Sequence, residues 1–216
     1  MKYYYKRKLP HYIVNGYYYF ITFRLANSIP LSKIFEFKNL YEKELERLSL
    51  INDNGIKSKE YSELKWNYFF KYDDVLDKNI LGQDWLKETQ LALIVSEALK
   101  YLDKKSYDLI AYSIMPNHVH LIIKSYLEIE EDESIYKQTY PLASIMSSIK
   151  RHSALKCNGI LQRTGEFWQH ENYDHIIRNE EEFSMIIEYT LNNPYKANLI
   201  DYDKNYEWNY FNPEIL

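Results

Sequence analysis

The sequence has little of what extracellular and membrane-embedded proteins usually contain. Its 216 residues include a single cysteine, Cys157, which excludes an internal disulfide and a cysteine-based zinc cluster. No apolar run approaches the roughly 18 residues that a membrane-spanning helix needs, and no apolar segment of the signal-peptide type follows the charged N-terminus. We therefore expect a cytoplasmic protein without a membrane partner, in which the ligands of any metal are histidines and oxygen donors.

Glycine and proline are also scarce, at five and six residues, and no low-complexity linker or internal repeat divides the chain. A chain of this length suits one large domain with a sizeable core. The segment 53–82 shows no clear helix or strand pattern, but its aromatic residues indicate packing rather than disorder. We therefore expect a single domain of residues 1–216 with an ordered insertion around residues 53–82.

Positive charge is in deficit, since the net charge is −4 and the isoelectric point is about 5.9. Such a balance by itself argues against a nucleic-acid partner. Residues 135–178 differ from the rest of the chain, because this segment contains six lysines and arginines but only three acidic residues and so has a net charge of +3. Aromatic side chains beside cations are typical of surfaces that bind single-stranded nucleic acid, although the 23 tyrosines carry little functional weight as a count.

What the chain does contain is a short apolar stretch with two histidines, Met115–Lys124. A Pro-Asn turn opens it, and its alternating pattern predicts a strand. Alternate residues of a strand point the same way, so His118 and His120 share one face and the apolar residues face the core. Two imidazoles at this spacing form half of a divalent-metal site. The alternative is that both are structural histidines, because the spacing alone is common.

Apolar periodicity predicts the remaining elements. We expect strands at 17–25, 107–114 and 118–124, and helices that begin at Pro30, Asp84, Pro141 and Asn179. The sequence Asn192-Asn193-Pro194 is expected to end the last helix. Strands and helices that alternate around an antiparallel hairpin predict an α+β sandwich with the helices on one face of an antiparallel sheet.

Tyr189 and Asn193 lie one turn apart on the last predicted helix, away from the centre of its apolar stripe. A tyrosine, with a pKa near 10, is a nucleophile only where its phenolate is stabilised. A nearby divalent metal could help by binding a phosphate oxygen and orienting the phosphorus for attack. The Asn193 amide could complete the ligands of that metal; the alternative is that an asparagine before proline only terminates the helix.

At this point the residues resemble a known family, the REP-associated tyrosine transposases, which are single-tyrosine HUH nucleases. The resemblance is carried by five segments that occur in order along the chain: Leu9-Pro10-His11, Phe20–Leu25, Met115–Leu121, Phe167–Gln169 and Tyr189–Ala197. Tyr72–Asp77 and Ile177–Asn179 also take part, so the resemblance covers most of the chain. Tyr195 departs from the family pattern, and residues 49–62 have no family counterpart.

The resemblance implies a ferredoxin-like α+β fold with the histidine pair on a central strand. It implies metal-dependent cleavage and rejoining of single-stranded, hairpin-forming DNA, as in DNA transposition. Carried over by position, His118, His120 and Asn193 would bind Mg²⁺ or Mn²⁺. Tyr189 would attack the scissile phosphate, leaving a 5′-phosphotyrosine bond and a free 3′-hydroxyl. A homodimer and an association with the nucleoid are further expectations.

The basic residues of two segments are the expected DNA contacts. They are Lys6, Arg7 and Lys8 in the N-terminal arm, and Lys150, Arg151, Lys156, Arg163 and Arg178 in the basic third of the chain. Two other functions stay open. One is a domesticated protein that binds a DNA hairpin without cutting it, and the other is a metal phosphoesterase that uses activated water, in which Tyr189 is structural.

Overall fold

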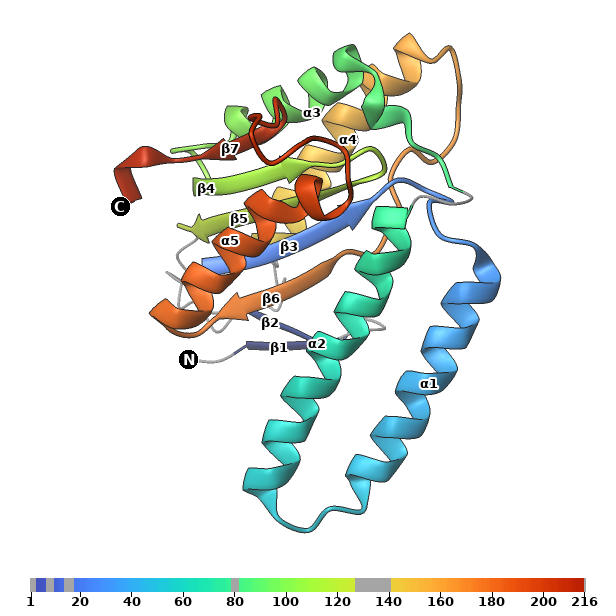
Figure 1. Cartoon of the computed structure of the whole chain (residues 1–216), viewed down its shortest axis with the longest axis vertical. Helices are drawn as coiled ribbons and strands as arrows, with labels where there is room; N and C mark the ends of the chain where they lie inside the picture. Colours follow the sequence, from blue (N-terminus) through green and yellow to red (C-terminus); the bar gives the residue numbers. More distant parts are fainter. Residues whose placement is uncertain (1–2, 7–9, 14–17, 79–81, 127–140, 216) are drawn as a thin grey trace, which may run out of the picture.

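The structure is a computed structural model that describes residues 3–6, 10–13, 18–78, 82–126 and 141–215. Its main body is a five-stranded antiparallel sheet with helices packed against it (Figure 1). The strands lie in the order β6-β3-β5-β4-β7, and β1 and β2 form a separate two-stranded sheet. No helix among the described residues is both long and apolar enough to cross a membrane.

The elements follow the chain with these bounds. The strands are β1 (Tyr3–Lys6), β2 (Pro10–Ile13), β3 (Tyr18–Arg24), β4 (Tyr107–Ile114), β5 (His118–Ser125), β6 (Tyr173–Ile177) and β7 (Asn209–Phe211). The helices are α1 (Leu31–Ser49), α2 (Asn54–Lys78), α3 (Thr89–Tyr101), α4 (Pro141–Ile160) and α5 (Glu180–Lys196), with short 3₁₀ turns η1 (Trp85–Lys87) and η2 (Pro213–Ile215).

The central strand is β5, which pairs with β3 on one side and β4 on the other. Every residue of β5 except Lys124 is buried, because the strand has neighbours at both edges and helices over both faces. Its two faces are lined as the alternation predicts. Val119, Leu121 and Ile123 belong to one apolar cluster and Ile122 to the other.

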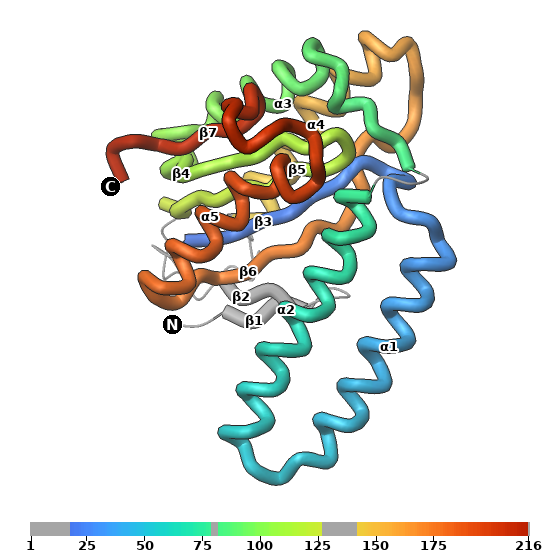
Figure 2. Tube along the Cα trace, viewed as in Figure 1, coloured from blue at the N-terminus to red at the C-terminus, as the bar shows by residue number. Residues whose placement is uncertain are grey.

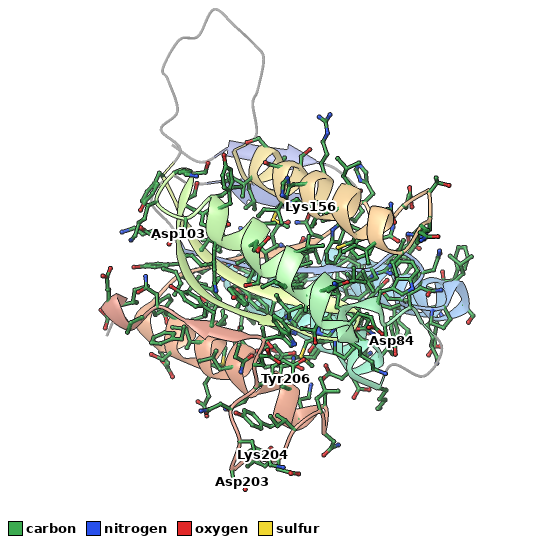
Figure 3. All side chains as sticks on the ribbon, turned by 90° about the horizontal axis from the view of Figure 1, so that it is seen from above. Asp84, Asp103, Lys156, Asp203, Lys204 and Tyr206 are labelled. Atoms are coloured by element: carbon green, nitrogen blue, oxygen red, sulfur yellow. The ribbon has the colours of Figure 1, made fainter. Side chains whose placement is uncertain are left out.

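The helices cover both faces of the sheet, and not one face as the sequence pattern suggests. The helices α3 and α4 pack against Tyr19, Ile21 and Leu121 on one face. The helices α2 and α5 pack through Phe69 and Ile186 against the face of Phe20. Figure 3 shows α3 and α4 on one side of the sheet and α5 on the other. The α+β class with an antiparallel sheet is confirmed. The helix predicted to begin at Asn179 is α5, and it packs on the face opposite to α3 and α4, because the apolar side chains of that face also need burial.

Residues 54–78, where no periodicity is evident, form the single long helix α2. Its apolar residues show no single period because one side of the helix packs against α1 and another side packs against the sheet. Tyr68 and Tyr72 contact Tyr41 and Phe37 of α1 at ring-centroid distances of 4.5 and 5.0 Å, whereas Phe69 faces the sheet. The helices α1 and α2 run antiparallel and extend beyond the sheet, as the trace in Figure 2 shows.

Two predicted helix ends are wrong. Asp84 begins only the short turn η1, and α3 starts at Thr89 after a cap at Glu88 that makes no side-chain hydrogen bond. Pro194 does not stop α5, which continues to Lys196. The Ala197 amide donates to the Asn193 carbonyl at 2.9 Å, so the hydrogen-bonding pattern resumes directly after the proline. Asn179 caps α5 as predicted, because its side chain accepts from the Glu182 amide at 2.8 Å.

Candidate active site

His118 and His120 point from the same face of β5, as the alternation predicts, and are fully buried. Their Nε2 atoms lie 3.1 Å apart. Each Nδ1 atom has a partner on the other side of its ring: Asn117 Oδ1 at 2.6 Å for His118, and Thr22 Oγ1 at 2.8 Å for His120. Partners of this kind fix the orientation of a metal-binding imidazole, so both Nε2 atoms are directed to one place.

The orientation of the Asn117 side chain is itself held by α2. Its Nδ2 group donates to the Leu76 carbonyl at 2.9 Å, which leaves Oδ1 to accept from Nδ1 of His118. A His118 ring with its proton on Nδ1 carries a lone pair on Nε2. Burial and the neighbouring His120 lower the pKa of His118 to about 3, so this imidazole is neutral at physiological pH and ready to act as a ligand.

Asp73, on α2, is the site residue that the sequence analysis missed. Its Oδ1 atom lies 3.3 Å from Nε2 of His120 and 3.7 Å from Nε2 of His118. The side chain is fully buried, and Oδ1 makes no hydrogen bond with any described residue. One signal could have revealed it. Phe69, Asp73 and Leu76 have the i, i+4, i+7 spacing of a buried helix face, and an aspartate is rarely fully buried unless it has a charged partner or a metal.

Tyr189 and Asn193, both from α5, complete the cluster. The Tyr189 hydroxyl donates to Oδ2 of Asp73. The Asn193 Nδ2 group lies 3.1 Å from the same oxygen and 2.8 Å from Nε2 of His120. The Asn193 Oδ1 atom is buried and has no partner among the described residues. The structure therefore brings together all four residues predicted as nucleophile and metal ligands, and adds Asp73.

The charges of the site act in opposite directions on its acidic groups. Burial acts to raise the pKa of Asp73, but His120, His118 and the Tyr189 hydroxyl outweigh it and hold this pKa below its ordinary value. Asp77, one turn further along α2, has its pKa raised to about 6 by burial and by the charge of Asp73, although Lys196 opposes this. The Lys196 Nζ atom lies 2.9 Å from Asp77 and 3.9 Å from Asp73.

Tyr189 is protonated in this arrangement. Burial, followed by the negative charge of Asp73 and the hydrogen bond to it, raises the pKa of the phenol far above its ordinary value. The ring lies against Phe70 of α2 and His120, at centroid distances of 5.6 Å in both cases. Its hydroxyl is thus held on the Asp73 carboxylate and next to the histidine pair.

The group formed by Asp73, His118 and His120 could hold a metal ion, because one ligand atom from each lies within 4.8 Å of the others. Imidazole nitrogens with a carboxylate oxygen are a common donor set for divalent metals. The buried oxygens of Asp73 and Asn193 that lack hydrogen bonds would otherwise cost free energy of desolvation. The residues present therefore fit a divalent ion.

The basic residues predicted to contact DNA are dispersed. Arg7 and Lys8 lie outside the described residues, and for Lys6 the description covers only the backbone, in β1. Lys150, Arg151 and Lys156 belong to α4, which covers the face of the sheet opposite the histidines. Arg163 lies over the ring of Trp85 and donates to the Glu166 carbonyl.

Arg178 is the basic residue of this set that lies nearest to α5. It is exposed just before that helix, and its guanidinium donates to Ser62 Oγ of α2 at 3.5 Å. Its backbone amide donates to Glu182 at 2.7 Å. Arg178 therefore lies on the same side of the sheet as Tyr189.

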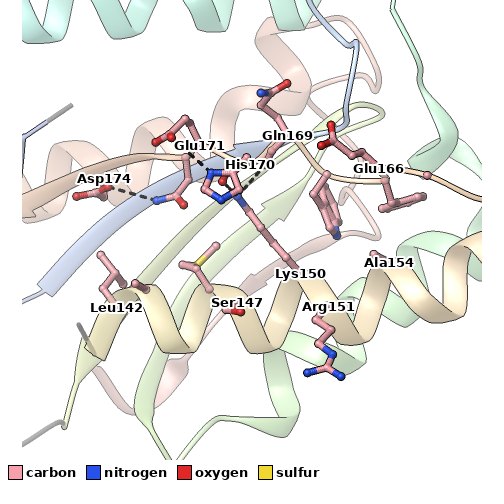
Figure 4. A pocket seen from close by; sticks show the side chains of 16 residues that line it. Leu142, Ser147, Lys150, Arg151, Ala154, Glu166, Gln169, His170, Glu171 and Asp174 are labelled. Carbon is pink, nitrogen blue, oxygen red and sulfur yellow. Dashed lines mark hydrogen bonds and ion pairs between the residues drawn. The ribbon is translucent and has the colours of Figure 1, made fainter. Parts of the chain in front are cut away.

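A cavity of about 420 Å³ lies between α4 and residues 165–174 (Figure 4). Lys150 and Arg151 line it with Met146 and Trp168. Lys150 Nζ donates there to the carbonyls of Gln169 and His170 at 3.0 and 3.1 Å, so this cation holds the loop in place. The cavity is on the opposite face from the histidine cluster and is not part of the candidate active site.

Comparison with known proteins supports the resemblance found in the sequence. No model of a known protein family matches the chain. A Haemophilus influenzae protein named "Putative REP-associated tyrosine transposase" is 21% identical over 114 residues, which are 50% of this chain and 61% of that protein. The match thus spans less than two thirds of the relative.

A solved structure shares the fold. It is described as a REP-associated tyrosine transposase bound to a REP hairpin, and it aligns with 95% of this chain and 80% of its own, with a TM-score of 0.52 and 16% identity. The predicted resemblance to these transposases and the predicted fold class are therefore confirmed.

Proposed function

We propose that this chain cuts and rejoins single-stranded DNA at hairpins in the manner of a REP-associated tyrosine transposase, acting in the cytoplasm. The observation that carries the proposal is the position of Tyr189. Its hydroxyl donates to the same carboxylate that faces His118 and His120. A tyrosine hydroxyl beside two imidazoles and a buried carboxylate that could hold a metal ion is an arrangement suited to phosphoryl transfer. The relative and the solved structure described above support the choice of hairpin DNA.

In the proposed reaction the Tyr189 oxygen forms a bond to the scissile phosphorus. The bond from phosphorus to the 3′-oxygen breaks, the 3′-hydroxyl leaves with the proton that the phenol gives up, and the 5′-phosphate stays on Tyr189. Attack by a 3′-hydroxyl reverses the step, so no external energy source is needed. A divalent ion, Mg²⁺ or Mn²⁺, would supply positive charge that orients the phosphate and stabilises the transition state.

The residues of the chain have separate roles in this proposal. His118, His120 and Asp73 would hold the ion. Asn193 would add its amide oxygen after rotation of its side-chain amide, because the Nδ2 group faces His120 Nε2 without the ion. The Oδ2 atom of Asp73 orients the Tyr189 hydroxyl and lies at the place where its proton leaves. Lys196, which is half exposed beside Asp77, adds positive charge where the phosphate must arrive. Burial and the contact with Asp77 act oppositely on Lys196, and the net effect raises its pKa, so it stays charged.

The test is the covalent intermediate. The purified protein is incubated with Mn²⁺ and a labelled library of single-stranded DNA hairpins, and a denaturing gel is examined for a protein-DNA band. We expect a band that is lost with Tyr189→Phe or with chelator. Tyr195→Phe is the matched control, since that hydroxyl, on the same helix, donates to the Lys204 carbonyl and the band should persist.

The other outcomes select the other functions. Hairpin binding that weakens with salt, without a covalent band, would indicate a binding protein that no longer cuts. Cleavage that survives Tyr189→Phe would indicate a phosphoesterase that uses water. Either result would contradict the proposed nucleophile.

A further inference from the structure

Two aromatic side chains of α2 lie on the approach to Tyr189 and have no part in the cluster of metal ligands. Phe70 is 40% exposed, and its ring centroid lies 5.6 Å from that of Tyr189. Trp66, one turn earlier, stacks on Phe70 with centroids 5.6 Å apart and planes 22° apart. Together Trp66 and Phe70 form a continuous aromatic surface, here called the aromatic platform, that ends at the proposed nucleophile.

The outer part of the platform, Phe70, differs from the buried aromatic residues next to it, whereas Trp66 also packs on the core through its contacts with Phe20 and Phe69. Phe69 is 3% exposed and packs on Phe20 and Tyr173, so its ring is part of the core. Phe70 is turned outward from the same helix, where solvent exposure of its ring costs free energy. An exposed aromatic ring next to a reactive group is a typical stacking surface for an unpaired base.

Positive charge adjoins the platform. Lys65 precedes Trp66 on α2, and Arg178 reaches α2 through its bond to Ser62. The partial burial of Lys65, and then the charge of Arg178, lower the pKa of Lys65 although Asp174 opposes them. Lys65 Nζ lies 4.9 Å from the ring centroid of Tyr61 on the same helix, so Lys65 and Arg178 both place positive charge at α2, and a phosphate is the anion that accompanies an unpaired base.

We propose that the aromatic platform binds a nucleobase of the unpaired DNA next to the scissile phosphate, while Lys65 and Arg178 contact the phosphates that follow it. Trp66, Phe70 and Asp73 follow one another along α2 at helical spacing, so the base subsite and the metal ligand Asp73 are parts of one rigid element. Such a subsite would position the phosphate for Tyr189 without reading the sequence. This proposal rests on the proposed function, because it takes the ligand to be single-stranded DNA.

The experiment compares two probes of equal charge, the oligonucleotide dT12 and a 12-unit abasic strand with the same phosphates. Binding is measured with Mg²⁺ in the Tyr189→Phe protein, so that no covalent product forms. Stacking of a base on an aromatic ring favours binding, so we expect dT12 to bind about tenfold more tightly than the abasic strand. Phe70→Ala should remove this preference and leave the affinity for the abasic strand unchanged, and Phe70→Trp should keep it.

The matched control is Phe35→Ala, which removes an exposed phenylalanine of α1 and should leave the preference unchanged. A preference that survives Phe70→Ala, an equal loss of affinity for both probes, or no preference in the parent protein would overturn the proposal. The covalent protein-DNA band with hairpin DNA is measured in a separate experiment with the wild-type protein. A band with no base preference would leave the transposase function standing without the platform, and a Phe70-dependent preference with no band would leave the platform without that function.

Discussion

Asp73 decides what the histidine pair can do. Two imidazoles alone give a metal too few ligands, and Asp73 adds the negative charge that a divalent ion attracts. The same carboxylate accepts the Tyr189 hydroxyl, so one residue connects the proposed metal site to the proposed nucleophile. Its burial without a bonded Oδ1 atom is costly in the metal-free protein and becomes favourable when a cation binds.

The first prediction concerns stabilisation by metal. Binding at a hundred times the dissociation constant stabilises a folded protein by about 2.7 kcal/mol, which for a chain of this size raises the melting temperature by roughly 5–10 °C. We expect Mn²⁺ to produce such a rise in the wild-type protein and none with Asp73→Ala, as measured by calorimetry. Asp74→Ala is the control, since Asp74 pairs with Lys78 at the surface. An equal rise in the Asp73→Ala protein would contradict the assignment.

The second prediction concerns acid stability without metal. The pKa of His118 is lowered to about 3, whereas the unfolded chain has the ordinary value near 6.5. Between these values the unfolded state binds the proton and the folded state does not. The contribution of His118 to the free energy of unfolding is therefore complete above pH 6.5. It is lost as the pH falls, by up to about 1.4 kcal/mol per pH unit. Asp77, with its pKa raised to about 6, acts in the opposite direction between about pH 4 and 6.

The comparison that isolates His118 uses His118→Gln. We expect the unfolding free energy of the variant, measured by urea denaturation with chelator, to fall less steeply with acid between pH 6.5 and 5 than that of the wild type. Asp77 lies 4.0 Å from Nε2 of His118, so the same comparison is repeated with Asp77→Asn in both proteins to remove its opposing effect. Equal slopes would show that His118 is not held neutral by the fold.

At the scale of elements, α5 carries Tyr189 and Asn193 on one face while its start is fixed by sequence-local bonds. Asn179 accepts from the Glu182 amide, and three glutamates occupy the first turn, where negative charge favours the helix dipole. The Glu182 side chain also bonds His175 of β6 at 2.7 Å. The helix is therefore anchored to the sheet at the end opposite to Asn193.

The third prediction tests this anchor. Asn179→Ala removes the N-cap and should lower the unfolding free energy by about 1 kcal/mol, within a range of roughly 0.5–2. Asn179→Ser should retain most of the unfolding free energy of the wild type, because a serine oxygen can accept the same hydrogen bond from the Glu182 amide. Urea denaturation measures both variants. No loss with alanine would mean that contacts of α5 with the sheet, and not its cap, determine where the helix begins.

At the scale of the molecule, the sheet separates two surfaces. The face covered by α2 and α5 contains the histidine cluster, and the face covered by α3 and α4 contains Lys156 and Arg151. Figure 3 shows Lys156 on α4, across the sheet from α5. Because the sheet lies between them, a strand bound at Tyr189 would have to pass around an edge of the sheet to contact α4.

The fourth prediction follows from this separation. Reversing the charge of α4 with Arg151→Glu and Lys156→Glu should leave the affinity for dT12 unchanged within about twofold. Arg178→Glu should weaken it and reduce the slope of log affinity against log salt by about 0.7 for each phosphate that the variant no longer binds. Fluorescence titrations over a range of salt concentrations measure both. An equal effect of the α4 reversal would show that the strand follows another path. The α4 contacts with longer hairpins stay predictions.

The sequence predicted best where a local rule sufficed. The strand alternation placed His118 and His120 on one face, and the Asn179 capping pattern identified the start of α5. Spacing of one turn placed Tyr189 and Asn193 together. The sequence-based prediction failed at Pro194, because the helix continues in spite of the backbone N–H that proline lacks. It also failed along α2, because this helix packs against both α1 and the sheet, so its apolar residues do not form one stripe. The single domain with an insertion around 53–82 and the homodimer stay predictions.

The sequence by itself thus determined which side chains share a strand face or a helix turn, since those relations depend only on backbone geometry over a few residues. Only the tertiary structure decided that Asp73 meets Tyr189 across 116 residues of chain, and that the basic helix α4 lies on the other face of the sheet. Contacts between distant segments depend on which apolar surfaces bury one another, and patterns that extend over only a few residues do not reveal that pairing.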